Sequence, residues 1–583
     1  MQTESLLIHF PSYPFTMDTL RPSSELASMA ASLADAGHAP RVADYGTLQT
    51  FERLYPSDMM PTILESQEQF NRRTPTSALG LALLHRWKLR RIARVLAAHH
   101  ERVAGEIADE IAASTRPNIA LFQVNSHSEF VSVLPIVRRL RQLHPQMISA
   151  VFGRYLFDYD HRGGRVASYD ALWQATDEFA CAYLGGAGAE LARFVESIED
   201  RSAWFTLPGI AYRHNRRLQV REATSPQNPN DLPSPLYDPA VYPAMDPANK
   251  IMLFDVDARG VVAAPTLEFD EHKTEGLGRR MLAAESMAVP HGGSNNPAVE
   301  EVSRLALAWG ARAFHFAGAA TTPGEVSALS YELLARRMNI RYSRDAHVGG
   351  ITSASISALK ASGCSALHFQ IDSGSQRLLD DYYGHNFGVT RAERAIRACT
   401  FSNLYTIAGF AYPSLEDDYH TRAETVRLIE RAKPDAAPIS LPPAARTRRT
   451  LGLVSKRRAP SVTQGAASGI HYDMFNEREA GIDKRTLKEH LELKEAILEL
   501  GIPTNVTPHT ALLAELAGYS GREDEFSAQV QREMYNGDAV GVATTVQEIN
   551  QGACPDTSAK SGAQSSDAIE LKPFVPYQNV VGN

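Results

Sequence analysis

The sequence between residues 367 and 414 opens with LHFQIDSGSQ (367–376) and closes with TIAGFAYPS (406–414). Each segment is a short apolar run that ends in small, turn-forming residues, which is the pattern of a buried strand and the loop after it. Between them, VTRAERAIRAC (389–399) has helical spacing and gathers its apolar side chains on one face: Ala392, Ala395, Ile396 and Cys399. A strand, a helix and a strand, with Gly and Ser at the carboxyl ends of the strands, are typical of α/β barrels that bind ligands with those loops.

The same alternation precedes this unit and predicts a partial barrel of four or five β/α units over residues 251–445. The strands expected before residue 367 are Ile251–Asp255, Ala313–Gly318 and Ile340–Asp345. The helices expected there are Pro297–Trp309, Thr322–Met338 and Ser353–Ser362.

Residues 1–215 show a second alternating pattern, which predicts a doubly wound, Rossmann- or flavodoxin-like α/β domain with a helical insertion at about 59–113. Its expected strands are Leu6–Phe10, Pro40–Asp44, Ile119–Val124, Ile148–Gly153 and Phe179–Leu184. In an open parallel sheet, ligands bind beyond the carboxyl ends of the strands, and small residues there let a large flat ligand approach the backbone. The residues at these ends are Asn125, Ser126, Gly153, Gly185 and Gly186.

The rest of the chain is predicted to be less regular. Residues 216–250 are rich in Pro, Asn, Ser and Asp, which is typical of a linker. Residues 446–552 are predicted to form a mainly helical C-terminal domain. Residues 553–583 are polar and rich in Ser, which favours a disordered tail.

The composition is that of a soluble globular protein, since 44% of the 583 residues are hydrophobic and 22% are charged. The net charge of −8 gives no reason to expect a nucleic acid as partner. No apolar run reaches the roughly 18 residues that a membrane span needs, and the start (MQTESLLIHF) lacks the pattern of a signal peptide. These features favour a cytoplasmic protein that makes no membrane contact.

The cysteines argue against a metal cluster. There are four, and no two form a CxxC pair: Cys181, Cys364, Cys399 and Cys554. Cys181 and Cys364 lie in apolar contexts (FACAYL and ASGCSAL), which is typical of small buried residues. Because clustered thiolates are needed to hold an iron–sulfur cluster, the sequence predicts no site of that kind.

Several segments, in the same order, resemble radical S-adenosylmethionine (SAM) enzymes that carry an N-terminal cobalamin-binding domain. The early ones are RPSSELASMAASLADAGH (21–38), VFGRYLF (151–157), LGGAGAELARFVESI (184–198) and LPGIAYRHNRRLQV (207–220). The later ones are IDSGSQRLLD (371–380) and GFAYPSLEDDYHT (409–421). The resemblance spans about residues 1–445. It implies a doubly wound cobalamin-binding domain, a partial barrel of the radical SAM type and a small helical C-terminal domain.

The resemblance also implies two cofactor sites. Cobalamin would lie against Asn125, Ser126, Gly153, Gly185, Gly186 and Glu190. SAM would lie against Gly318 and Ala319 at its methionyl end, Arg344, Asp372, Ser373 and Ser375 on its ribose side, and Gly409 and Phe410 on its adenine side. Asp372 stands where the family usually has Glu, and the shorter carboxylate can still accept a ribose hydroxyl. The alternative is that these loops bind no ligand.

The chain departs from the family where the iron–sulfur cluster is held. The family's three cysteine positions fall on Val261, Pro265 and Glu268, and no cysteine occurs from Ala182 to Gly363. A [4Fe–4S] cluster is therefore not expected, and neither is a 5′-deoxyadenosyl radical. Arg154 replaces a glycine that would lie near a corrin. The loop after the second strand (DYGT, 44–47) lacks the family's cobalt-ligating histidine, so no imidazole from that loop is expected on cobalt.

Two functions remain open. The first is a cobalamin-dependent transferase that works without the cluster, by polar methyl transfer from SAM to a small-molecule or natural-product intermediate, or by a rearrangement. It would need an external reductant. The second is an inactive relative, a ligand-binding or partner subunit of an intact radical SAM paralogue. A weaker third reading is a barrel enzyme that uses His315, His347 or His368 as acid or base.

Overall fold

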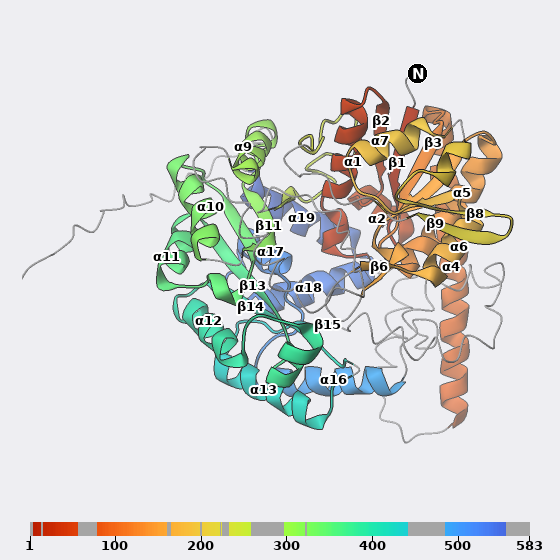
Figure 1. Cartoon of the computed structure of the whole chain (residues 1–583). Coiled ribbons are helices and arrows are strands. Elements are labelled where there is room, and N and C mark those ends of the chain that lie inside the picture. The colour runs from red at the N-terminus through yellow and green to blue at the C-terminus, as the bar shows by residue number, and fades with distance from the viewer. Residues whose placement is uncertain are drawn as a thin grey trace, which may run out of the picture.

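The computed structural model describes residues 4–12, 15–55, 79–159, 165–198, 201–221, 223, 232–257, 296–320, 323–414, 416–440 and 484–554. The expected positions of the cluster cysteines (261, 265 and 268), the start of the predicted helical insertion (59–78) and the predicted tail from residue 555 onward lie outside these residues. Two large sheets, with helices around them, lie side by side, and the helices of residues 508–553 lie between them (Figure 1).

The first sheet has seven strands in the order β2-β1-β3-β4-β7-β8-β9. The first five pair in parallel, and the bounds of all five fall within two residues of the predicted ones: β1 (Glu4–His9), β2 (Ala39–Asp44), β3 (Ile119–Gln123), β4 (Ile148–Phe152) and β7 (Cys181–Tyr183). Every residue of β3 and β4 is buried, as expected for strands covered on both faces. The sheet ends in an antiparallel hairpin that was not predicted, β8 (Ile210–His214) and β9 (Arg217–Arg221).

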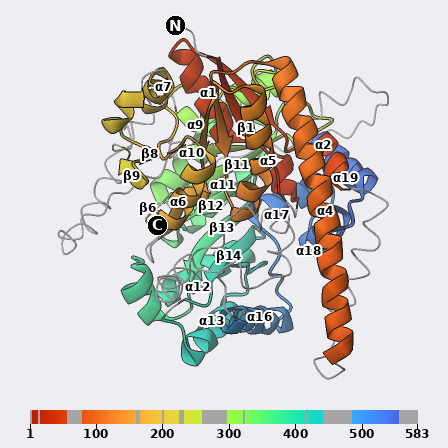
Figure 2. The same ribbon diagram turned by 90° about the vertical axis from the view of Figure 1, so that its right-hand side faces the viewer.

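Helices cover both faces of the first sheet. They are α1 (Ser24–Asp35), α2 (Leu48–Leu54), α4 (Leu79–Ser114), α5 (His127–Leu143), α6 (Tyr169–Glu178) and α7 (Ala189–Glu196). Ser23 caps α1, as its sequence suggests, because its hydroxyl accepts from the amide of Leu26 at 3.3 Å. The long helix α4 packs along α5 and extends past the sheet (Figure 2). Short elements complete this half: β5 (Phe157–Tyr159) with β6 (Arg165–Ala167), η1 (Met17–Leu20), η2 (Arg154–Leu156) and η3 (Arg201–Phe205).

The second sheet has six parallel strands in chain order. They are β10 (Leu253–Asp257), β11 (Ala313–Ala320), β12 (Arg341–Ala346), β13 (Cys364–Asp372), β14 (Tyr405–Ala411) and β15 (Ile439–Ser440). Its helices are α9 (Pro297–Trp309), α10 (Pro323–Ala335), η5 (Val348–Gly350), α11 (Ser353–Ala361), η6 (Leu378–Tyr383), α12 (Val389–Phe401) and α13 (Tyr419–Ala432). In α12 the four residues predicted to share a face are the four that are buried.

Four helices follow: α16 (Lys484–Glu499), α17 (Pro508–Leu516), α18 (Glu523–Asn536) and α19 (Ala539–Ala553). α17 packs on β12 and β13, and α19 contacts α2 beside the first sheet. One large cluster of buried apolar side chains runs through both sheets and these helices, so the two halves share a core. No described helix is long and apolar enough to cross a bilayer.

Within the predicted linker (216–250), residues 217–221 form β9 of the first sheet, and residues 232–250 pack against that sheet. Residues 232–250 have no helix or strand, yet Tyr237, Tyr242 and Met245 are buried. The amide of Leu236 donates to the carbonyl of Ala27, and the amide of Val42 donates to that of Val241. The segment therefore fixes the position of β10 relative to the first sheet.

Candidate functional site

The carboxyl edge of the first sheet carries the residues predicted to contact cobalamin. Asn125 and Ser126 follow β3, Gly153 follows β4, and Gly185 and Gly186 follow β7. All five are partly exposed, so the edge presents small residues to solvent. Glu190 lies in the first turn of α7. Burial, and then the charge of Glu190, raises the pKa of Tyr183.

Local hydrogen bonds hold this edge in place. Ser126 caps α5 by accepting from the amide of Glu129 at 3.1 Å, and the Glu129 carboxylate accepts from the amide of Asn125 at 2.6 Å. The Asn125 side chain in turn accepts from the amide of Arg154 at 3.3 Å. Burial raises the pKa of Glu129. The side chain of Arg154, which replaces a glycine expected near a corrin, is exposed at this edge.

Gly153 and Gly185 are required by packing within the protein. Gly153 has φ +115°, and a Cβ there would lie 2.3 Å from the carbonyl oxygen of Val124. A Cβ on Gly185 would lie 2.5 Å from the hydroxyl of Tyr183, which donates to the carbonyl of Gly186 at 2.8 Å. These glycines thus bring neighbouring loops close together whether or not a ligand is bound.

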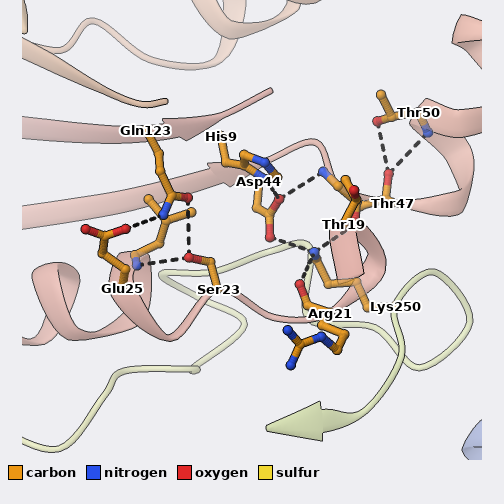
Figure 3. A network of polar contacts seen from close by, with 12 residues as sticks. His9, Thr19, Arg21, Ser23, Glu25, Asp44, Thr47, Thr50, Gln123 and Lys250 are labelled. Atoms are coloured by element: carbon orange, nitrogen blue, oxygen red, sulfur yellow. Dashed lines mark hydrogen bonds and ion pairs between the residues drawn. The ribbon is translucent and has the colours of Figure 1, made fainter. Parts of the chain in front are cut away.

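The β1–β2 half of the same edge is closed by a buried ionic network that the sequence did not reveal (Figure 3). Asp44, at the end of β2, accepts from Lys250 Nζ at 2.6 Å and pairs with His9 Nδ1 at 2.8 Å. The hydroxyl of Tyr242 donates to the same carboxylate. Lys250 Nζ also donates to the carbonyls of Gly46 (2.8 Å) and Arg21 (3.1 Å).

Burial and the neighbouring charges shift the pKa values of this network in opposite directions. Burial would raise the pKa of Asp44, but Lys250 and His9 outweigh it and hold that pKa below the usual range. Burial lowers the pKa of Lys250, although Asp44 acts against the shift. The pKa of His9 is raised because the hydrogen bond and charge of Asp44 outweigh burial. The network is therefore an ion pair with a histidine at its side, at the point where β1 ends.

At the carboxyl edge of the second sheet, Asp372 is the residue best placed to meet a ligand. It ends β13 in a left-handed conformation, with φ +68°. Its carboxylate accepts from Gln370 Nε2 at 2.5 Å and pairs with His385 Nε2 at 2.7 Å. Because a carboxylate has about four lone-pair sites, Asp372 can still accept from a ligand hydroxyl.

The serines that follow Asp372 are turned into the protein. Ser373 is 2% exposed and Ser375 is 3% exposed. The Ser373 hydroxyl accepts from the amide of Ser375 at 3.1 Å, and the amide of Gly374 donates to Thr425 of α13 at 2.9 Å. A Cβ on Gly374 would lie 2.4 Å from the Cα of Thr425. This turn is thus packed against α13, and it fixes the backbone that follows Asp372.

The other residues predicted to contact SAM do not all gather at Asp372. A Cβ on Gly409 would lie 2.9 Å from Gln370 Oε1 and 2.8 Å from His368 Nε2, so Gly409 makes room for these two side chains. Gly318 has φ +88° in a stretch where the pairing of β11 with β12 shifts register. Arg344 is 1% exposed and donates to the carbonyl of Val326 in α10 at 3.1 Å. Its side chain therefore lies on the helix-covered face of the sheet, outside this group.

The opposite face of the second sheet carries a row of polar residues that the sequence pattern did not group. Asp255, His315 and Ser343 are register partners on β10, β11 and β12. His315 Nδ1 lies 2.9 Å from the Ser343 hydroxyl, and its ring lies 4.2 Å from that of His509 of α17. Burial and then His509 lower the pKa of His315 to about 3. A neutral imidazole is therefore held between the sheet and α17.

Ion pairs connect this row of polar residues to the segment that follows β1 of the first sheet. Asp255 pairs with Arg21, next to η1, at 2.6 Å and with His509 Nε2 at 3.0 Å. Asp18 pairs with Arg21 Nε at 3.1 Å. Nearer the carboxyl edge, Asp345 pairs with His368 Nδ1 at 2.9 Å. Among the described residues, no three His, Cys, Asp or Glu side chains are placed to hold a metal ion.

All four cysteines are buried and lie on separate elements, as expected for small core residues. Cys181 lies on β7, Cys364 on β13, Cys399 on α12 and Cys554 after α19. Burial raises the pKa of the Cys399 thiol to about 12 and raises that of Cys364 as well. Neither of these thiols is a ready thiolate ligand at neutral pH.

The fold is similar to that of a solved radical SAM methyltransferase. The structure of the radical SAM methyltransferase TsrM from Kitasatospora setae, with cobalamin and a [4Fe–4S] cluster bound, aligns over 91% of this chain and 100% of its own, at 13% identity and a TM-score of 0.52. The cobalamin-dependent SAM radical enzyme OxsB, with aqua-cobalamin and SAM bound, aligns over 96% and 81%, at 11% identity and a TM-score of 0.46. No protein-family model and no curated protein matches the sequence. The resemblance seen in the sequence therefore extends to the fold.

Proposed function

We propose that this protein is a cobalamin-dependent methyltransferase that uses SAM without an iron–sulfur cluster. One combination of observations carries the proposal. The chain has, nearly end to end, the fold of a methyltransferase that binds cobalamin, yet its sequence contains no cysteine from residue 182 to residue 363. Polar methyl transfer fits that combination because it needs no adenosyl radical. It does need an external reductant, and the acceptor is a small molecule.

The first sheet offers a surface that fits cobalamin. Its carboxyl edge after β3, β4 and β7 consists of small, partly exposed residues, and a flat macrocycle needs such an edge to approach the backbone. Asn125, Ser126, Gly153, Gly185 and Gly186 would hold it, with Glu190 close by in α7. When bound, cobalamin supplies a nucleophilic metal centre that can carry a methyl group. The residues of this chain would position it.

The second sheet offers Asp372 for the ribose of SAM. The carboxylate is oriented by Gln370 and His385 and keeps acceptor capacity. The turn at Ser373 to Ser375 fixes its backbone against α13. The SAM site proposed here is centred on Asp372, with Gly409 on the adenine side and Gly318 on the methionyl side.

Methyl transfer can be tested without knowing the acceptor. When the protein is mixed anaerobically with hydroxocobalamin, a Ti(III) reductant and SAM, we expect about one S-adenosylhomocysteine per bound cobalt and no 5′-deoxyadenosine. Protein-free cobalamin with the same reductant is the control. Release of 5′-deoxyadenosine would contradict the cluster-free reaction. The absence of both products would favour the alternative, a partner subunit of an intact radical SAM enzyme.

Replacing Asp372 with asparagine is expected to weaken SAM binding about tenfold or more. The substitution keeps the left-handed backbone, which Asn tolerates, but removes the charge that accepts the ribose hydroxyl. A hydrogen bond to a charged group contributes about 1.5–3 kcal/mol, and about 1.4 kcal/mol corresponds to a tenfold change in affinity. Calorimetric titration with SAM measures the effect.

Asp381→Asn is the matched control for that titration. Asp381 is an exposed aspartate in η6, and its substitution removes the same charge from the same part of the chain. We expect its affinity for SAM to equal that of the unmodified protein. Equal affinities in Asp372→Asn and Asp381→Asn would rule out the ribose contact.

A further inference from the structure

A cavity of about 310 Å³ lies between the segment after β1 and helices α17 and α18. Its volume is at the lower end of the range of about 300–1,000 Å³ that small-molecule sites occupy. None of the residues proposed to hold cobalamin or SAM lines it. The cavity is therefore distinct from both proposed cofactor sites.

The inner wall of the cavity is apolar. Six of its residues are buried apolar side chains, none more than 9% exposed: Phe15, Met17, Leu513, Phe526, Val530 and Met534. Two aromatic rings and two flexible thioethers make a wall that adapts to a flat hydrocarbon group. A ligand here would bury its apolar part.

The mouth of the cavity is polar and carries a negative charge. Thr16, Asp18, Asn505 and Gln531 line it, and all four are exposed. The side chain of Asp18 is 51% exposed, and the carboxylate pairs with Arg21 Nε at 3.1 Å and lies 3.8 Å from His509 Nδ1. Arg21 also pairs with Asp255, so its charge is shared between two carboxylates.

The negative charge of the cavity lining favours cationic ligands over anionic ones. Asp18 is acidic, and neither Lys nor Arg occurs among the described residues that line the cavity. A bound carboxylate or phosphate would face Asp18 without a cationic partner in the wall. A protonated amine would meet a carboxylate that retains acceptor capacity.

We propose that this cavity binds a compact, mainly apolar molecule that carries a protonated amine, with its ring or chain among Phe15, Phe526 and Met534 and its amine at Asp18. This site is independent of the proposed methyl transfer. Its occupant would touch the ion pairs that join the first sheet, β10 and α17, because Asp18 and His509 belong to them.

Two fluorescent probes that share a ring test the proposal on the full-length protein. They are 2-(2-naphthyl)ethylamine, a cation, and 2-naphthylacetate, an anion. We expect the amine to bind at least about tenfold more tightly than the acid, with the blue shift of a naphthalene that leaves water. Equal affinities, or no saturable signal from the amine at millimolar concentration, would overturn the proposal.

Two variants locate the site, and one serves as control. Asp18→Asn is expected to remove the preference for the amine, and Val530→Trp, which fills the cavity, is expected to abolish binding of both probes. Asp524→Asn changes an exposed aspartate of α18 that does not line the cavity, and it should leave both affinities unchanged. Unaltered amine binding in Asp18→Asn or in Val530→Trp would place the probe elsewhere and overturn the proposal.

Discussion

The substitution Lys250→Met is expected to destabilise the protein by about 3–5 kcal/mol, which is typical when one partner of a buried ion pair is removed. Lys250 and Asp44 have side chains 0% and 1% exposed, and their charged atoms lie 2.6 Å apart. Methionine keeps the volume of the lysine stem but leaves the Asp44 carboxylate without its cation. It also leaves the carbonyls of Gly46 and Arg21 without their donor.

Urea unfolding followed by circular dichroism at pH 7 measures the loss of unfolding free energy in Lys250→Met. The double variant Lys250→Met, Asp44→Asn should recover part of it, because no buried charge then remains. Lys360→Met is the matched control, since Lys360 is an exposed lysine that donates to the backbone carbonyl of Ser402, and it should cost less than about 1 kcal/mol. A Lys250→Met variant as stable as the Lys360→Met variant would contradict the network.

The loss of stability caused by Lys250→Met should become smaller as the pH falls. In the native protein the pKa of Asp44 lies below its ordinary value, so its contribution to stability is present above about pH 4 and is lost as the pH falls. Without Lys250 that pKa rises. The difference between variant and native protein should therefore shrink as the pH is lowered from 7 toward 4.

Arg21→Met is expected to cost about 2–3 kcal/mol, less than Lys250→Met because the partners of Arg21 are partly exposed. Arg21 is itself 11% exposed and pairs with Asp255, which is 28% exposed. Since Asp255 also pairs with His509, the substitution weakens the attachment of β10 and α17 to the first sheet. Amide hydrogen exchange should therefore accelerate in α17 more than in β3.

Arg53→Met is the control for that comparison. Arg53 also pairs with two carboxylates, Glu106 and Glu110, but both are exposed and both lie on α4 beside the first sheet. Its loss should cost less than about 1 kcal/mol and leave exchange in α17 unchanged. The same exchange rates in α17 for Arg21→Met and Arg53→Met would refute the coupling between the halves.

Several of the parallel strands could be predicted from the sequence because they are short apolar runs that precede turn residues, as in β3 (IALFQ) and β4 (ISAVF). The five predicted strands of the first sheet and those of the second recur near their expected bounds. The β8–β9 hairpin was missed for a physical reason. Its turn is Asn215-Arg216, with φ of +49° and +61°, and it lacks the glycine that usually marks such a turn. The partly buried strands on either side gave no strong apolar run.

The candidate site could be predicted only in part. Asp372 was expected at a strand end, and the structure places it there with free acceptor capacity. Arg344 was expected beside it, but side chains alternate along a strand, so Arg344 lies on the face opposite to Ser343 and Asp345. The pairing of Asp44 with Lys250 joins residues far apart in the sequence. No local sequence pattern predicts a contact between residues so far apart.

The measurement that tests the central claim most directly is the metal content of the protein. It would be purified anaerobically with hydroxocobalamin, treated with iron and sulfide, and analysed for cobalt and iron together with its visible spectrum. We expect about one cobalt and no iron per chain, because the chain lacks the three clustered thiolates that a cluster needs. Stoichiometric iron would contradict the cluster-free account, and the absence of both metals would contradict cobalamin dependence.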